Sequence, residues 1–200
     1  MKIISIINQK GGVGKTTTVI NLASALSQQD KKILVIDLDP QGNATTGLGL
    51  SNTASSDQTI YNVLNGNKKI SEVIQSTKFT NLDLITSNVD LSGLEVETAG
   101  DSDRAFLLKE KINEFLESNQ NEFSYIFIDC PPSLSLLTVM ALVVSNSLIV
   151  PLQTEFFALE GLTQLIKTID RIKDNLNPNL KVRGILLTMF DKRNKLSSQV

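Results

Sequence analysis

The chain carries a series of short apolar runs that are rich in β-branched residues and predict strands. These runs cover residues 2–7, 33–36, 82–85, 125–128, 148–150 and 182–188. They are apolar at nearly every position rather than at every second one. Such continuity is typical of parallel strands that helices cover on both faces. Pro151 follows one of the runs and is expected to end that strand, because proline cannot donate to a sheet.

Longer stretches between these runs have apolar residues every three or four positions and predict helices. They cover residues 16–28, 89–97, 103–117, 134–144 and 158–174. Residues 40–58 are predicted to form a polar loop with a short helical turn, and residues 59–75 two short helices. Strands that alternate with helices predict an α/β fold with a doubly wound, mostly parallel sheet and helices on both faces. Without an internal repeat or a low-complexity linker, residues 1–200 are expected to form one domain.

The composition is that of an ordinary globular protein, with 41% hydrophobic and 20% charged residues and a net charge of −2. The charge is unevenly distributed, since residues 161–200 hold 8 basic and 3 acidic side chains. The basic ones are Lys167, Arg171, Lys173, Lys181, Arg183, Lys192, Arg193 and Lys195. This basic fifth of the chain could contact a phosphate backbone, or it could be the solvated face of a helix and a loop. Charge alone leaves both interpretations open.

Several absences narrow the chemistry and the expected compartment. The chain contains no histidine, so proton transfer must use carboxylates, lysines or water. Its single cysteine, Cys130, excludes an internal disulfide and fits a reducing cytoplasm. No apolar run approaches the roughly 18 residues that a membrane span requires. The chain enters its first strand directly, without a charged and then apolar leader.

A glycine-rich segment, residues 8–18, follows the first predicted strand and precedes the first predicted helix. Glycines in that setting let successive backbone N–H groups point at an anion, and the helix N-terminus adds partial positive charge. Lys15 would reach the β- and γ-phosphates of a nucleotide, and the Thr16 hydroxyl would bind Mg²⁺. The pattern therefore predicts a nucleotide site.

The loop departs from the standard phosphate-binding motif at one position. The standard pattern requires glycine where this chain has Gln9, and a second lysine, Lys10, follows. The loop resembles the deviant Walker A motif of the ParA/MinD class of ATPases. That resemblance implies that Lys10 reaches into the nucleotide site of the other subunit of an ATP-bound dimer. On the residues alone, Lys10 could also be a solvated loop lysine.

Three aspartates follow predicted strands, at the sheet edge where open α/β folds bind ligands. Asp129 ends one apolar strand and is typical of a Walker B residue, which holds Mg²⁺ through water. Alternatively, Asp129 starts a turn before the two prolines that come next. Asp37 and Asp39 follow another strand, and Asp37 could contact Mg²⁺ directly or act as a capping group behind the site.

Two of these segments, residues 37–45 and 129–134, resemble the switch I and Walker B regions of ParA proteins, and residues 153–161 resemble a third stretch of the Soj-type members. The resemblance implies that Asp39 orients or activates the attacking water. It also implies that Thr16 binds Mg²⁺ and that Thr17 contacts phosphate. The residues that would cradle the phosphates are Gly11, Gly12, Val13, Gly14 and Lys15.

The ParA resemblance further implies an ATP- and Mg²⁺-dependent homodimer that binds double-stranded DNA without sequence preference. A ParB-like partner would stimulate hydrolysis, and the protein would be cytoplasmic, on the nucleoid when ATP is bound and not on a membrane. Family members normally continue beyond the point where this sequence stops, so a single P-loop ATPase domain, residues 1–200, without its C-terminal closing elements is expected.

The residues suggest four alternatives to a ParA-type partition ATPase. A MinD-like ATPase would require an amphipathic membrane helix. A nucleotide-binding module without turnover and an amide-forming ligase with this fold are also possible. Cys130 next to Asp129 could suggest an iron–sulfur ligand, but one thiolate from each subunit is too few for a four-cysteine cluster, which favours a packing role.

Overall fold

The structure, a computed structural model, describes residues 1–50, 57–118, 123–155, 158–191 and 193. Its centre is a seven-stranded sheet in the order β3-β4-β2-β5-β1-β6-β7. The strands are β1 (Lys2–Ile6), β2 (Ile33–Asp37), β3 (Gln75–Ser76), β4 (Leu82–Ile85), β5 (Tyr125–Asp129), β6 (Ser147–Gln153) and β7 (Lys181–Thr188). All neighbours pair in parallel except β3, which runs antiparallel to β4. The α/β prediction is therefore confirmed.

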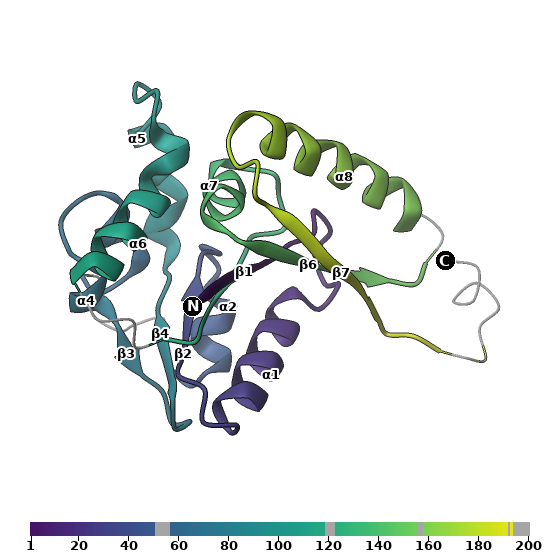
Figure 1. Cartoon of the computed structure of the whole chain (residues 1–200), viewed down its shortest axis with the longest axis horizontal. Coiled ribbons are helices and arrows are strands. Elements are labelled where there is room, and N and C mark those ends of the chain that lie inside the picture. Colours follow the sequence, from purple (N-terminus) through teal and green to yellow (C-terminus); the bar gives the residue numbers. More distant parts are fainter. Residues whose placement is uncertain (51–56, 119–122, 156–157, 192, 194–200) are drawn as a thin grey trace.

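Helices cover both faces of the sheet (Figure 1). The α-helices are α1 (Lys15–Ser27), α2 (Asn43–Gly47), α3 (Ile60–Leu64), α4 (Ile70–Val73), α5 (Leu94–Glu97), α6 (Leu107–Ser118), α7 (Leu136–Val144) and α8 (Ala158–Asn175). Two 3₁₀ turns, η1 (Val89–Gly93) and η2 (Arg104–Phe106), precede α5 and α6. The predicted helices 89–97 and 103–117 thus each begin with a 3₁₀ turn, and residues 51–56 of the predicted loop lie outside the described residues.

The hydrophobic core lies in two layers, one on each side of the sheet. On one side, Val19 and Ala23 of α1 pack against β-strand residues such as Val35 and Phe127. On the other side, apolar side chains of α3 to α8 form the larger cluster, with α7 buried at almost every position. Because both faces of the central strands are covered, these strands are apolar throughout.

The strand that contains Pro151 is longer than predicted. β6 continues through Pro151 to Gln153, so the expectation that the proline ends this strand was wrong. Beyond Ile149, β6 no longer pairs with β1, while its ladder with β7 continues. The carbonyl of Pro151 accepts a hydrogen bond from the Asn8 side chain on the β1 side. The missing N–H faces that same side, where no ladder partner requires it.

Strand order brings the distant predicted site segments to one edge of the sheet. β5 lies between β1 and β2, and Asp129 is in register with Ile6 on one side and with Asp37 on the other. The glycine-rich loop follows β1, and the segment with Asp39 follows β2. The carboxyl ends of the central strands therefore meet at one place, where folds of this type bind ligands.

Candidate functional site

The loop between β1 and α1 has the backbone shape that the glycine pattern predicted. Gly12 and Gly14 have φ angles of 74° and 88°, a left-handed region that glycine occupies without steric cost. Gly14 precedes α1 and offers no side chain to cap it. The first N–H groups of this 13-residue helix are therefore available to a bound anion.

A cleft of about 380 Å³ opens above this loop. It is lined by Gly11, Gly12, Gly14, Lys15, Thr16, Thr17, Asp39, Gln41, Asn43, Pro132 and Met189. Most of the predicted site residues therefore come together around one cavity. Val13 does not line the cleft, because its side chain is buried in the core, but its carbonyl accepts a 2.9 Å hydrogen bond from the Thr188 hydroxyl at the end of β7.

Lys15 is the cation at the floor of this cleft. Only 7% of the residue is exposed, and its Nζ donates a 3.1 Å hydrogen bond to the carbonyl of Lys10. Burial lowers the pKa of the Lys15 ammonium, while the charges of Asp129 and Asp39 oppose that shift. A bound phosphate would be an anionic partner for the Lys15 ammonium and would offset the free-energy cost of its burial.

Asp129 is fully buried, and neither of its carboxylate oxygens has a hydrogen-bond partner among the described residues. Burial and the nearby Asp37 raise its pKa to about 7. The Thr16 hydroxyl, which is near Asp129 but outside hydrogen-bond geometry, and the charge of Lys15 offset this in part. A buried carboxylate without a partner is costly unless a ligand completes it. Its position beside Thr16 therefore suits a cation held between them.

The described residues contain no group of three or more His, Cys, Asp or Glu side chains arranged to hold a metal. Mg²⁺ at nucleotide sites usually needs fewer protein ligands, because phosphates and water complete its octahedral shell. Thr16 and the partnerless Asp129 carboxylate fit that mode of binding.

The two aspartates after β2 have different surroundings. Asp37 is fully buried and accepts hydrogen bonds from the backbone N–H and the hydroxyl of Thr45, both at 2.7 Å. Burial raises its pKa to about 6 despite these bonds. Asp39 lines the cleft, and its Oδ1 accepts a 3.0 Å hydrogen bond from the N–H of Gln41. Its second oxygen, Oδ2, is thus the one more open to a ligand in the cleft.

Lys10 lies outside the cleft, on the β6 side of the loop. Its Nζ forms an ion pair with Glu155, and both side chains are partly exposed. The backbone N–H of Lys10 donates to Asn8, which in turn is bound to the carbonyl of Pro151. The loop therefore holds Lys10 at the surface, away from the phosphate cradle of its own chain.

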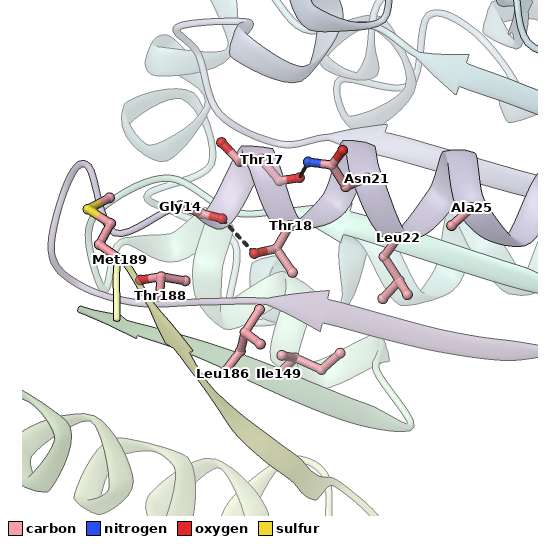
Figure 2. A pocket seen from close by; sticks show the side chains of 10 residues that line it. All are labelled: Gly14, Thr17, Thr18, Asn21, Leu22, Ala25, Ile149, Leu186, Thr188 and Met189. Carbon is pink, nitrogen blue, oxygen red and sulfur yellow. Dashed lines mark hydrogen bonds between the residues drawn. The ribbon is translucent and has the colours of Figure 1, made fainter. Parts of the chain in front are cut away.

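A second, larger cavity of about 690 Å³ adjoins the cleft (Figure 2). It lies between α1 and the strands β6 and β7, and its lining is mostly apolar. Leu22 and Ala25 of α1 face Ile149 and Leu186 of the sheet across it. Gly14, Thr17 and Met189 line both cavities, so the two lie side by side near the start of α1.

Residue patterns alone did not identify several parts of this site. Gln41 and Asn43 lie in the segment 37–45 that resembles switch I, and the glycine after Gln41 is a usable signal for a turn into the cleft. Met189 follows β7, and the strand-end rule could have found it. Cys130 packs in the larger core cluster, and burial raises the pKa of its thiol, as suits a packing residue.

The site combines a glycine-rich loop between a buried strand and a helix with a buried lysine and an aspartate on the adjacent strand. These features define a P-loop nucleotide-binding protein of the α/β class.

None of the described helices is long and apolar enough to cross a membrane.

Comparison with known proteins gives the family. A family model described as an AAA domain matches residues 1–182. The chromosome partitioning protein ParA of Caulobacter vibrioides is 47% identical over 200 residues, which are all of this chain and 74% of that protein. The chromosome-partitioning ATPase Soj of Treponema pallidum is 44% identical over 199 residues, covering 76% of its length. The chain therefore belongs to the ParA/Soj family of chromosome partitioning proteins.

A solved structure supports the same fold. It is described as cobyrinic acid a,c-diamide synthase from Mycobacterium smegmatis with bound ATP analog and magnesium. It superposes with a TM-score of 0.92 at 35% identity and covers all of this chain and 77% of its own.

Proposed function

We propose that this chain is an ATP-dependent switch that dimerises, binds DNA without sequence preference and hydrolyses ATP to drive chromosome or plasmid partitioning. The observation that carries the proposal is the cleft in which Lys15, Thr16 and Asp39 converge next to the partnerless Asp129 carboxylate. Partition names among the relatives and the ATP analog with magnesium in the Mycobacterium structure support it.

Each side of the cleft has a distinct role in this proposal. The backbone from Gly11 to Lys15 and the start of α1 bind the phosphates, with Thr17 as a further contact. Thr16 and Asp129 would hold Mg²⁺, Asp129 through water, and the ion would neutralise charge on the β- and γ-phosphates. Lys15, already desolvated, stabilises the charge that develops during phosphoryl transfer.

Asp39 would orient the attacking water in this proposal. It is 6% exposed and lines the same cleft as the glycine-rich loop, and one of its carboxylate oxygens accepts a hydrogen bond from Gln41. A carboxylate in that position can hold water in line with the γ-phosphate without acting as a strong base.

Dimerisation and DNA binding form the second half of the proposal. Lys10 sits at the surface, where it could reach the nucleotide of a second subunit once it leaves Glu155. A closed dimer pairs two basic surfaces, and affinity for phosphate backbones rises steeply with the number of contacts. A ParB-like protein would stimulate hydrolysis, and the ATP-bound dimer would reside on the nucleoid in the cytoplasm.

The name of the Mycobacterium structure indicates amide synthesis, which is a different use of ATP. We favour partitioning because the relatives that carry partition names are 44–47% identical, against 35% for that structure. A synthase would consume ATP only with an acid substrate and an amine donor, whereas a partition switch hydrolyses it without either.

Asp39→Ala tests the catalytic assignment. We expect ATP hydrolysis to fall by about 100-fold or more, because the attacking water loses its acceptor, while the affinity for Mg²⁺–ATP changes little. Steady-state phosphate release and equilibrium binding of a fluorescent ATP analogue would measure the two effects. Asp170→Ala, an exposed carboxylate on α8, is the matched control. Wild-type rates of hydrolysis in Asp39→Ala would show that another group orients the water.

A further inference from the structure

Two aspartates end neighbouring strands in register, yet their surroundings differ sharply. Asp37 of β2 and Asp129 of β5 are opposite each other in the ladder, and both are fully buried. Asp129 accepts no hydrogen bond from the described residues. Asp37 accepts one from the N–H of Asp39 and two from Thr45. Of these two aspartates, only Asp129 lacks hydrogen-bond donors among the described residues, and a bound cation would compensate for their absence.

Asp37 accepts a hydrogen bond from a backbone N–H in the first turn of helix α2. Gly42 occupies the N-cap position with a φ of 64°, and glycine has no side chain that could accept from the first turn. Thr45 is the third residue of that turn, and its N–H donates to Oδ2 of Asp37 at 2.7 Å. Asp37 thus caps α2 from the preceding strand, in the way that an N-cap side chain normally does.

The Thr45 hydroxyl also connects Asp37 and helix α2 to the segment that follows β4. It donates to Oδ2 of Asp37 at 2.7 Å and accepts from the N–H of Ser87, which follows β4, at 3.0 Å. Thr45 is fully buried and Ser87 is 1% exposed. An apolar side chain at position 45 would therefore leave the Ser87 N–H without an acceptor, which is costly in a buried position.

Asp39 lies within the segment that these bonds enclose. Its N–H donates to Oδ1 of Asp37 at 3.2 Å, and its carbonyl accepts from the N–H of Gly42 at 2.9 Å. The backbone on both sides of Asp39 is therefore fixed, by β2 and Asp37 on one side and by the start of α2 on the other. These anchors fix the backbone, and the Gln41 N–H, which donates to Oδ1, holds the Asp39 side chain at the cleft.

We propose that Asp37 and Thr45 are positioning residues that hold Asp39 toward the nucleotide, and that Asp37 is not a direct ligand of Mg²⁺. The proposal rests on the proposed function, because Asp39 has a catalytic role only if the chain hydrolyses ATP. A metal on Oδ2 of Asp37 would have to displace the cap of α2, and one on Oδ1 would compete with the Asp39 N–H. One strand away, Asp129 offers two oxygens without hydrogen bonds from the described residues.

Thr45→Val tests the proposal, because it keeps the shape of the side chain and removes only the hydroxyl. We expect kcat for ATP hydrolysis to fall by about 10- to 100-fold while KM changes by less than about threefold, since a displaced water-orienting group affects the reaction rather than binding. Thr45→Ser retains the hydroxyl and should recover most of the rate. Thr163→Val, which removes an exposed hydroxyl on α8, is the control for general effects.

The Asp39→Ala background separates positioning from a general structural effect. If Thr45 acts through Asp39, adding Thr45→Val to Asp39→Ala should not reduce the residual rate further. A further reduction by the same factor as in the wild type would overturn the proposal, as would an unchanged kcat in Thr45→Val. Should Thr45→Val not fold, Asp37→Asn is the second variant, because its amide presents a donor either to the Asp39 N–H or to the Thr45 N–H and so breaks one of the same anchors.

Two outcomes keep this proposal distinct from the proposed function. Absence of hydrolysis by the wild-type chain would overturn the function and the positioning role together. Hydrolysis by the wild-type chain with an equal rate in Thr45→Val would overturn the positioning role alone.

Discussion

At the scale of single residues, Lys10 has surroundings that differ from those of the other lysine of the loop. Lys15 is buried and bound within its own cleft, whereas 52% of the Lys10 side chain is exposed. Its ion pair with Glu155 is also partly solvated, and such surface pairs contribute little free energy. Lys10 can therefore leave Glu155 for a better anionic partner at small cost, as a role across a dimer interface requires.

Lys10→Ala should abolish ATP-dependent dimerisation and spare nucleotide binding by the monomer. The reason is that Lys10 contributes nothing to the cleft of its own chain beyond its backbone carbonyl, which alanine keeps. Sedimentation velocity with ATP, with ADP and without nucleotide would report the dimer, and calorimetry would report the affinity. Lys31→Ala, at an exposed lysine after α1, is the control. A parallel loss of dimer and nucleotide affinity would contradict the cross-subunit role.

The turn of the glycine-rich loop could be predicted from the sequence, but the hydrogen-bond partners of the nearby aspartates could not. The spacing of Gly12, Gly14 and Lys15 fixes a turn with only a few backbone solutions. The contrast between Asp37 and Asp129 depends instead on Thr45, which lies eight residues after Asp37 and contacts it only because α2 folds back. Nothing in the local pattern around either aspartate reports such a contact.

At the scale of elements, strand β7 contacts the glycine-rich loop, although about 175 residues of sequence separate the two. The Thr188 hydroxyl at the end of β7 donates to the carbonyl of Val13, and a side chain at Gly14 would lie 3.5 Å from the Thr188 methyl group. The last described strand thus packs directly against the glycine-rich loop.

Thr188→Val should weaken nucleotide binding without abolishing it. Valine keeps the shape of threonine but removes the hydrogen bond to the Val13 carbonyl, at a cost of about 1 kcal/mol. The part of this cost that bound nucleotide must repay to restore the shape of the loop raises the Kd for Mg²⁺–ATP by up to a few-fold. Isothermal titration calorimetry would measure the Kd. Thr168→Val removes a hydroxyl that also donates to a carbonyl, but within α8, and should leave the Kd unchanged. An unchanged Kd in Thr188→Val would mean that the loop holds its shape without β7.

Most elements could be predicted from the periodicity of apolar residues, because long buried segments produce strong patterns. The strands β1, β2, β4, β5 and β7 lie where the apolar runs predicted them. β3 was missed because two residues at a sheet edge carry no pattern. β6 was predicted too short because the effect of Pro151 depends on which neighbour its nitrogen faces, and that is a property of the sheet.

At the scale of the whole molecule, most of the described basic residues of the C-terminal fifth lie on exposed positions of α8 and β7 and just beyond, and Lys173 of α8 is half-buried. Lys167 and Arg171 are exposed on the helix, and Lys181 and Arg183 on the strand. Arg193 is bound to the neighbouring Asp191, which reduces its availability. Lys192 and Lys195 lie outside the described residues, as do residues 156 and 157 of the Soj-like stretch.

The described strands all belong to one sheet, which supports our proposal that residues 1–200 form one P-loop domain. Fold class was predictable because the alternation of strands and helices admits few arrangements. The distribution of charge over a dimer could not be predicted, because it depends on which surfaces of the two copies are in contact.

The most direct test of the proposed switch is retention of the chain on random-sequence duplex DNA, with ATP and with ADP, at about 50 mM and about 200 mM salt. We expect retention with ATP at the lower salt, a strong loss at the higher salt as phosphate contacts are screened, and little retention with ADP. Lys15→Ala should abolish the effect of ATP, because it removes the buried phosphate contact. Equal retention with both nucleotides, or none with either, would contradict the account.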